Sequence, residues 1–285
     1  KMVDNTIQKL ESEDRITPYD FVVIDEIRQH VSLRSSQIIK LADRHTGIGF
    51  DQLLLIEPPS RPDADFDYRI FNSDGSEVEH CGNGIRCFAK FVTDRGLTSR
   101  NNIVINAAKG LIELMITEEG LVRVNMGHPN FNPPDIPYKV PPEPDQTHTV
   151  AFPTPEGKLA VGLVSIGNPH AVIIVEDLSA IDVHGISQML QKSIQFPDSV
   201  NVGFLQIDSR ESVKIRVYER GAGETLACGT GACAAIAYAR SIDRVAESVT
   251  VTTLGGQLRI DYEQEGSDLI MTGPAESVFE GEFRL

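Results

Sequence analysis

Short apolar runs separated by turn-forming residues dominate the first half of the chain and predict strands rather than long helices. The runs lie at residues 21–24, 53–56, 68–71, 103–105, 111–116 and 121–124. Runs of this length, bounded by Gly, Pro, Asn or Asp, are typical of strands. The last three follow one another closely and predict an antiparallel meander.

Two segments of the first half have a helical pattern. The polar stretch 6–15 predicts a short helix that Pro18 ends. Ser35 predicts the N-cap of a second helix, which stops at Gly47. The apolar face of this second helix is formed by Ile38, Ile39 and Ala42. The first half therefore combines many strands with few helices.

The second half has the same balance of strands and helices. Apolar runs lie at residues 161–166, 172–175, 202–207, 213–218, 249–253, 258–262 and 269–271, and a helix is predicted at 186–193. Residues 213–218 alternate strictly, with Val213, Ile215 and Val217 on one face and basic side chains on the other. This alternation is typical of a half-buried antiparallel strand.

A proline-rich stretch separates the two halves. Residues 129–155 hold nine of the sixteen prolines, a composition that suits neither a helix nor a central strand. A chain of 285 residues is also longer than most single domains. We therefore predict an N-terminal lobe at residues 1–126 and a C-terminal lobe at 127–273, with the segment 274–285 returning to the first lobe.

Composition and charge narrow the class of protein. The chain is 41% hydrophobic and 24% charged, as ordinary globular proteins are. Its formal net charge of −15 argues against binding to nucleic-acid phosphates, which requires clustered Lys and Arg. The sequence has no apolar run long enough to span a bilayer, and residues 1–15 lack the apolar core of a signal peptide. We expect a cytoplasmic protein that binds neither nucleic acid nor a membrane.

A cysteine followed by two spaced glycines occurs once in each half. The first copy is Cys81-Gly82-Asn83-Gly84, and Cys228-Gly229-Thr230-Gly231 follows 228 − 81 = 147 residues later. Each copy runs into a segment of small and apolar residues, and a glutamate precedes each cysteine by four residues, at Glu77 and Glu224. We interpret the pattern as an internal duplication that places one thiol at the start of a helix in each half.

A thiol at the start of a helix has a defined chemistry. The first backbone N–H groups of a helix have no partner within the helix and carry the positive end of its dipole, so they favour a nearby anion. We therefore expect the pKa of Cys81 and that of Cys228 to be lowered, which makes thiolate available near neutral pH. The glycines would let backbone amides approach a ligand closely. Two such sites facing each other predict a small pocket with two sulfur acid/base groups.

The other cysteines have a simpler interpretation. Cys87 and Cys233 fall inside the predicted helices, where small buried apolar residues are expected. Zinc sites use closely spaced cysteine pairs, whereas five and four residues separate the two cysteines of each half. We therefore expect no metal. A thiol-redox or metal-binding module is the less favoured alternative to an enzyme.

Four motifs taken together resemble those of diaminopimelate epimerases. They are RIFNSDGS at 69–76, CGNGIRC at 81–87, GNPH at 167–170 and YERGAGETLACGTGAC at 218–233. The resemblance runs from about residue 20 to the C-terminus. It implies an α/β (α+β) fold of two pseudo-symmetric domains, each a mostly antiparallel sheet or barrel wrapped around a central helix. It also implies a homodimer, no cofactor, and interconversion of LL- and meso-diaminopimelate on the route to lysine and peptidoglycan.

The resemblance implies roles for individual residues. Cys81 and Cys228 match the acid and base that exchange protons at the α-carbon, with roles that reverse between the two epimers. His170 and Glu219 match groups that tune the two cysteines. The positions that match substrate-binding residues are Gln52, Asn72, Gly82, Asn83, Asn168, Asn201, Glu219, Arg220, Gly229 and Thr230.

The residue types themselves fit this chemistry. Inversion of an amino-acid α-carbon without an electron-accepting cofactor requires a base on one face and an acid on the other, and two thiols can fill both roles. A proline or hydroxyproline racemase uses the same logic and is the nearest rival. Such an enzyme has little use for Asn72, Asn201 and Arg220, which suit the charged distal end of a longer amino acid.

The N-terminal segment departs from the family pattern. Family members begin with Lys-Met, a His-Gly-Leu-Gly-Asn loop and Asp-Phe, whereas residues 3–19 stand here between Lys1-Met2 and Asp20-Phe21. Tyr19 occupies the place of the substrate-contacting Asn, and a phenol does not replace an amide that both donates and accepts. Either the altered segment reduces activity, or another residue such as Asn5 substitutes, or this N-terminus is not the natural one.

Overall fold

The computed structural model describes residues 6–11, 20–78, 82–108, 110–139, 148–155 and 157–283. The chain divides into two compact units. The first unit comprises Lys1–Asn125 and Thr272–Leu285, and the second comprises Met126–Met271. The C-terminal segment therefore completes the unit that the start of the chain begins.

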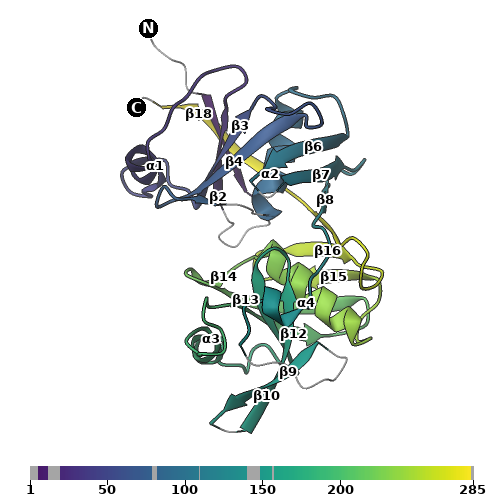
Figure 1. Ribbon diagram of the computed structural model, residues 1–285. Helices are drawn as coiled ribbons and strands as arrows, with labels where there is room; N and C mark the ends of the chain where they lie inside the picture. The colour runs from purple at the N-terminus through teal and green to yellow at the C-terminus, as the bar shows by residue number, and fades with distance from the viewer. Residues whose placement is uncertain are drawn as a thin grey trace. The chain divides into compact units, whose positions relative to one another are not determined.

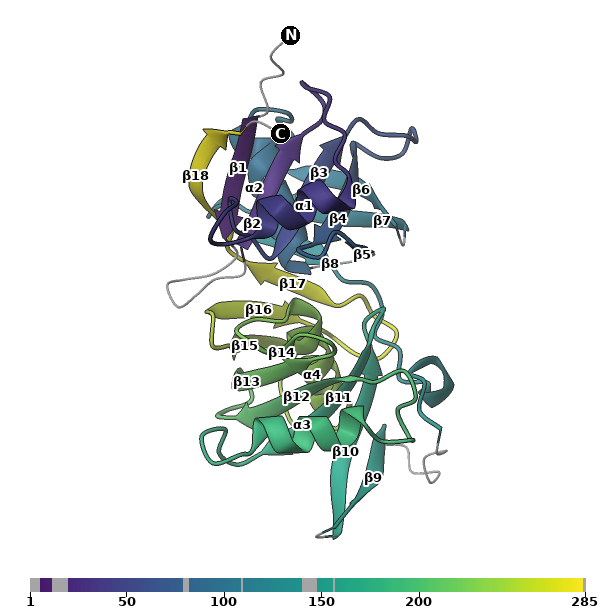
Figure 2. The ribbon, with the colours of Figure 1, turned by 90° about the vertical axis from the view of Figure 1, so that its left-hand side faces the viewer.

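The first unit is a mixed sheet with one buried helix and one outer helix. Its elements are β1 (Thr6–Glu11), β2 (Asp20–Asp25), α1 (Ser35–Ala42), β3 (Gln52–Glu57), β4 (Phe66–Asn72), β5 (Glu77–Val78), α2 (Gly82–Asp94), β6 (Asn102–Ala107), β7 (Gly110–Ile116), β8 (Val122–Asn125) and β18 (Glu276–Glu282). The strands pair in the order β18, β1, β2, β3, β4, β6, β7, β8, and β5 also pairs with β4. The pairs β2–β3 and β4–β6 are parallel, and the others in this series are antiparallel. Figure 2 shows α1 in front of these strands and α2 behind them.

The second unit has the same plan. Its elements are η1 (Pro133–Asp135), β9 (Thr149–Thr154), β10 (Gly157–Ser165), β11 (Pro169–Val175), α3 (Val183–Gln191), β12 (Asn201–Ile207), β13 (Ser212–Glu219), β14 (Gly223–Thr225), α4 (Gly229–Ser241), β15 (Ser248–Thr252) and β16 (Gln257–Asp261), and β17 (Ile270–Gly273) spans the boundary of the two units. The strands pair in the order β9, β10, β11, β12, β13, β15, β16, and β14 also pairs with β13. Figure 1 shows α4 lying among these strands, whereas α3 lies at the outside.

The pairing of the strands repeats between the two units. The series β2–β3–β4–β6–β7 is parallel, antiparallel, parallel, antiparallel, and β11–β12–β13–β15–β16 follows the same sequence. The hairpin register repeats too, because Ile70 pairs with Val78 in one unit and Val217 pairs with Thr225 in the other. Both partners are displaced by 217 − 70 = 225 − 78 = 147 residues. The duplication predicted from the cysteine motifs is therefore present in the topology.

The two central helices are buried on nearly all sides, which is why small and apolar residues fill them. Every residue of α4 from Gly229 to Ala239 is buried, and such a helix belongs inside a unit rather than on its surface. Cys87 and Cys233 are both fully buried, as predicted. Arg86 is a fully buried charged residue in α2, and its Nε donates to the carbonyl oxygen of Pro274 at 3.0 Å. This bond ties the returning C-terminal segment to the central helix.

Two local predictions are wrong. The stretch 6–15 was predicted to be helical, but residues 6–11 form β1, which pairs antiparallel with both β2 and β18. Hydrogen bonds from two neighbouring strands outweigh the helical preference of a short polar stretch. In α1 the N-cap is Arg34 rather than Ser35, and the helix ends at Ala42 rather than at Gly47. Ile39 is 50% exposed, while Ile38 and Ala42 face the core as predicted.

A pair of glutamates in the first unit predicts an unusual dependence of stability on pH. Burial, the hydrogen bond that protonated Glu26 donates to Glu57 and the charge of Glu57 raise the pKa of Glu26 to about 7, against a smaller opposing effect of Arg69. A raised carboxyl pKa stabilises the fold fully below pH 4.5, and this contribution is lost as the pH rises through about 7. Glu26→Gln should therefore raise the melting temperature at pH 8 by ~2–4 °C, about 1 kcal/mol after solvent screening, and leave it unchanged at pH 4.5.

The matched control for this prediction is Glu118→Gln, which removes the same charge from an exposed turn. It should change the melting temperature little at either pH. Calorimetry at both pH values separates the two variants. An equal gain from both at pH 8 would mean that the reduction of net negative charge, rather than the Glu26–Glu57 pair, is responsible.

Candidate active site

A glycine fixes the start of each central helix against a strand. A Cβ added at Gly84 would lie 2.6 Å from the hydroxyl oxygen of Tyr68 and 3.3 Å from Ile70 on β4. At Gly231 an added Cβ would lie 3.0 Å from Val217 on β13, the position equivalent to Ile70. The shortest distance at each glycine, 2.6 Å at Gly84 and 3.0 Å at Gly231, is less than an ordinary van der Waals contact of a Cβ atom. The second glycine of each motif therefore lets the first turn of its helix pack closely against the neighbouring strand.

An arginine–glutamate pair braces the hairpin that leads to each helix. Arg69 donates to Glu77 from Nε and Nη2 at 2.7 and 2.9 Å. Arg216 donates to Glu224 from the same two atoms at 2.6 and 3.0 Å. Fork-shaped pairs of this kind hold both groups in a fixed orientation. Since 216 − 69 = 224 − 77 = 147, the brace belongs to the duplicated unit.

Cys228 occupies the N-cap position of α4 and is 6% exposed. Its Sγ lies 3.5 Å from Oγ1 of Thr230, and its thiol donates to the carboxylate of Glu219. Glu219 also accepts a hydrogen bond from Thr225, with 2.6 Å between Oγ1 and Oε1. The prediction of a cysteine at the start of a helix is confirmed for Cys228. The corresponding prediction for Cys81, which directly precedes α2, lies outside the described residues.

The predicted lowering of the Cys228 pKa is wrong. Burial raises the pKa of this thiol well above its usual value, and the negative charge of Glu219 raises it further. Hydrogen bonds from Thr230 and from the backbone N–H of Gly231 oppose the rise but do not outweigh it. Burial also raises the pKa of Glu219, although the bonds from Thr225 and Cys228 act to lower it. Cys228 is therefore a protonated thiol beside a carboxylate that can accept its proton.

A hydrogen-bonded chain leads from Cys228 to His170. Nε2 of His170 lies 3.0 Å from Oδ1 of Asn168, and Nδ2 of Asn168 donates to Oγ1 of Thr230 at 3.3 Å. Burial, and to a lesser extent the charge of Arg220, lower the pKa of His170 to about 3, so the ring is neutral at neutral pH. Because an amide oxygen only accepts, Nε2 carries the ring proton. Nδ1 is then a bare acceptor, and among the described residues this buried atom has no hydrogen-bond partner.

Asn201 and Arg220 lie beside this chain. Asn201 is opposite His170 in the β11–β12 register and is 4% exposed. Its Nδ2 donates to the carbonyl oxygen of Pro169 at 3.2 Å, and its Oδ1 accepts from the backbone N–H of Arg220 at 2.8 Å. Nη1 of Arg220 donates to the carbonyl oxygen of Asp198 at 2.9 Å. Asn201 therefore holds the backbone on both sides of the predicted site.

The second unit brings together most of the predicted site residues. They are Asn168, His170, Asn201, Glu219, Arg220, Cys228, Gly229 and Thr230. Sequence reasoning missed Thr225, whose hydroxyl contacts Glu219. A hydroxyl residue on the hairpin strand that directly follows a predicted functional carboxylate is the signal that could have identified it.

The remaining predicted residues lie in the first unit. Gln52 is 6% exposed, and its Nε2 donates to Oδ1 of Asn72 at 2.9 Å, while Nδ2 of Asn72 donates to Oγ of Ser76 at 3.2 Å. Oε1 of Gln52 is buried and has no hydrogen-bond partner among the described residues. Gly82 and Asn83 are the first two residues of α2, and both are buried. Gln52 therefore presents an unused buried acceptor in the first unit.

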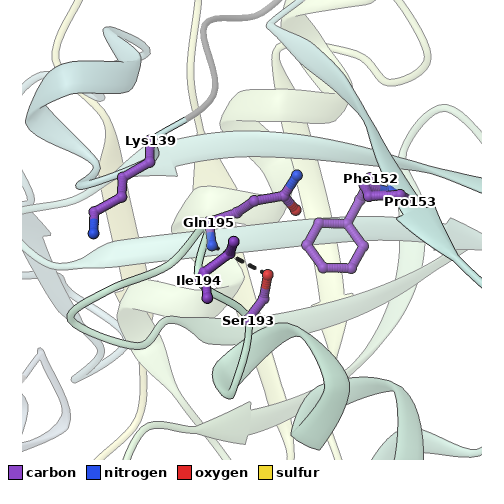
Figure 3. Close-up of a pocket in the computed structure, with 6 residues that line it drawn as sticks. All are labelled: Lys139, Phe152, Pro153, Ser193, Ile194 and Gln195. Carbon is purple, nitrogen blue, oxygen red and sulfur yellow. Dashed lines mark hydrogen bonds between the residues drawn. The ribbon is translucent and has the colours of Figure 1, made fainter.

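A cavity of about 370 Å³ lies elsewhere in the second unit. It is lined by Lys139, Phe152, Pro153, Ser193, Ile194 and Gln195, and Figure 3 shows their side chains around it. None of these residues takes part in the hydrogen-bonded chain around Cys228. In the part of the chain that the structure describes, no three His, Cys, Asp or Glu side chains form a group that could hold a metal ion. Within the same residues, no helix has the length and apolarity needed to cross a membrane.

Comparisons of the sequence with known proteins identify one family. The sequence profile of the family described as diaminopimelate epimerase matches residues 16–132 and 162–278. The two stretches begin 162 − 16 = 146 residues apart, close to the spacing of the cysteine motifs. A diaminopimelate epimerase of Chromobacterium violaceum is 50% identical over 266 residues, which cover 93% of this chain and 95% of the relative.

Two solved structures share the fold at low sequence identity. A phenazine biosynthesis protein of the PhzF family from Bacillus anthracis gives a TM-score of 0.71 at 14% identity, with all of both chains covered. A hydroxyproline epimerase from Agrobacterium vitis, solved with bound trans-4-hydroxy-L-proline, gives a TM-score of 0.68 at 14% identity, covering 98% of this chain and 92% of that one. The predicted sheet-dominated α+β fold with few helices is confirmed by these matches.

Proposed function

This chain belongs to the diaminopimelate epimerase family, and we propose that it interconverts LL- and meso-diaminopimelate by proton transfer at the α-carbon, without a cofactor. The observation that carries the proposal is the thiol of Cys228, held at the start of a buried helix beside the carboxylate of Glu219. A protonated thiol with an adjacent proton acceptor suits a group that serves as acid in one direction and base in the other.

The proposed reaction uses two thiols in opposite protonation states. For one epimer, the thiolate of Cys228 forms when Glu219 accepts its proton, and this thiolate removes the α-hydrogen as a proton. The thiol of Cys81 donates a proton to the opposite face of the same carbon. One proton leaves the substrate and one enters it, so the product is the inverted centre. For the other epimer the two cysteines exchange roles.

The unused acceptor atom Nδ1 of His170 suits this residue to a role like that of Glu219. A neutral imidazole with an unused acceptor can take a hydrogen bond from a thiol, as Glu219 does for Cys228. We propose that His170, like Glu219, tunes one of the two cysteines. The N-termini of α2 and α4 would then hold the substrate carboxylate, because the backbone N–H groups of Gly82, Asn83, Gly229 and Thr230 stabilise the negative charge that spreads onto it as the proton leaves.

The polar side chains outside the helix starts are proposed to hold the rest of the substrate. Gln52 has an unused buried acceptor that suits an ammonium group. Asn72, Asn168, Asn201 and Arg220 supply amide and cationic groups for the ammonium and carboxylate of the distal centre. A proline-type substrate has no distal centre, so these groups favour a diamino diacid.

The proposal is tested by incubating the protein with LL-diaminopimelate, meso-diaminopimelate, L-proline and trans-4-hydroxy-L-proline in deuterated water. We expect deuterium to enter the α-position of diaminopimelate together with inversion, and no exchange with the two cyclic amino acids. Mass spectrometry measures the exchange, and chiral chromatography measures the inversion. Exchange with proline or hydroxyproline but not with diaminopimelate would assign the protein to the racemase activity instead.

The assembly and the compartment extend the same proposal. We propose a homodimer that acts in the cytoplasm on a free amino acid, in the synthesis of lysine and of peptidoglycan precursors. Light scattering of the eluting protein should give about twice the mass of one 31.3 kDa chain. A mass of one chain would overturn the homodimer and leave the reaction untouched.

A further inference from the structure

We propose that Thr225 is a positioning residue for the reaction, because its hydroxyl orients the Glu219 carboxylate that receives the proton of Cys228. This inference rests on the proposed function. Glu219 is the last residue of β13, and Thr225 is the last residue of β14. The two strands pair antiparallel, with Thr225 opposite Val217. The hydroxyl donates to Oε1 of Glu219 at 2.6 Å, the distance of a strong charge-assisted hydrogen bond.

The direction of the hydrogen bonds defines what Thr225 does. A carboxylate only accepts, so the single proton of the Thr225 hydroxyl must point at Glu219. This bond favours the ionised carboxylate and opposes the effect of burial, which raises the pKa of Glu219. It also removes the freedom of the carboxylate to rotate away from the thiol. Thr225 thus orients Glu219 as a proton acceptor and opposes the effect of burial on its pKa.

Other charged groups near Glu219 have different partners. Arg216 on the same strand is bound to Glu224, and Arg220 donates to the carbonyl oxygen of Asp198. His170 is buried and neutral at neutral pH. Among the residues that the structure describes, Cys228 and Thr225 are the two side chains that act on the carboxylate by hydrogen bonding. The orientation of Glu219 toward the thiol therefore depends on Thr225.

The duplicated hairpin of the first unit supports a role beyond folding. Val78 stands at the position equivalent to Thr225, and Asn72 stands at the position equivalent to Glu219, since 225 − 78 = 219 − 72 = 147. The first hairpin keeps the same register and the same arginine–glutamate brace with valine at this position. A hydroxyl is therefore not needed to form the hairpin. The hydroxyl is present in the second unit, where the carboxylate of Glu219 accepts a hydrogen bond from Cys228.

The test compares Thr225→Val, which has nearly the same shape, with Thr225→Ser, which keeps the hydroxyl. We expect Thr225→Val to lower kcat/KM for diaminopimelate by ~10- to 100-fold and to move the acidic limb of its pH profile upward by about one pH unit. Thr225→Ser should stay within about threefold of the unchanged protein with the same acidic limb. Melting temperatures of both variants should stay close to that of the unchanged protein.

A double variant separates positioning from a structural effect. In a Glu219→Gln background, Thr225→Val should cause almost no further loss, because the group that it orients is gone. Equal losses from Thr225→Val with and without Glu219, or equal losses from Val and Ser, would overturn the proposal. So would an unchanged pH profile in Thr225→Val.

A measurement without substrate keeps this inference apart from the proposed function. The rate at which iodoacetamide alkylates Cys228, followed by mass spectrometry of the peptide that contains it, reports thiolate in the protein alone. We expect the acidic limb of this rate to move upward by about one pH unit in Thr225→Val and not in Thr225→Ser. If the unchanged protein fails to turn over diaminopimelate, the proposed function fails and this limb still decides the role of Thr225. Turnover by the unchanged protein with an unmoved limb overturns Thr225 alone.

Discussion

Cys228→Ala should remove epimerisation of diaminopimelate, with a loss of about 10³-fold or more in turnover. The variant deletes the group that we assign as base for one epimer and as acid for the other, and proton transfer by a positioned side chain contributes about 10²–10⁴-fold. Because inversion needs a transfer at each face, the loss should be seen with both LL- and meso-diaminopimelate. Cys81→Ala should be equally inactive, and the double variant should lose little more, as residues that act as a unit do.

The matched control for this variant is Cys233→Ala, which removes a second thiol from the same helix. Cys233 is fully buried in α4 and is not part of the hydrogen-bonded chain at the N-terminus of the helix. We expect its turnover to remain within about threefold, with a small loss of stability from the smaller side chain. Turnover by Cys228→Ala within tenfold of the unchanged protein would contradict the two-thiol reaction.

Elements whose apolar pattern is complete within a few residues could be predicted from the sequence. The alternation of residues 213–218 gave β13 with Val213, Ile215 and Val217 buried, because period-two burial is a local property of a strand on a sheet. The repeat of the Cys-Gly-x-Gly motif predicted the two central helices, because the run of small and apolar residues after each motif is also a local pattern. By contrast, β1 depends on β18, which comes from the other end of the chain. The local pattern of polar residues does not indicate that such a partner strand exists.

For the site, the sequence predicted which residues take part, but it did not predict their protonation. The motifs located Cys228, Glu219, Asn168 and His170, and the structure connects them. The sign of the Cys228 pKa shift could not be predicted, since it depends on how completely the folded chain excludes water and on a carboxylate brought in by a hairpin. Thr225 was missed for a similar reason, as its role follows from a 2.6 Å contact rather than from its residue type.

The second large effect concerns the packing of α4, the helix that carries Cys228. Gly162 lies on β10 directly beneath Tyr238 of α4, and a Cβ added there would overlap the aromatic ring. The ring has little freedom to move away, since Tyr238 is 4% exposed and its hydroxyl is hydrogen-bonded to Thr149 on β9 at 2.8 Å. Gly162→Ala must therefore displace the helix from the sheet or break that hydrogen bond. We expect a loss of about 1–3 kcal/mol and a melting temperature lower by ~2–12 °C.

Gly203→Ala is the control that isolates the overlap. Gly203 is buried on the nearby strand β12, yet among the described residues a Cβ there would meet only Ile215, at the ordinary contact distance of 3.6 Å. Since neither glycine has a positive φ, alanine fits the backbone at both positions, and Gly203→Ala should be neutral or stabilising by about 0.4–1 kcal/mol. Thermal unfolding of the two variants side by side decides the matter. Similar melting temperatures would mean that α4 can shift on its sheet without cost, and the geometry at Cys228 would then not be fixed by this packing.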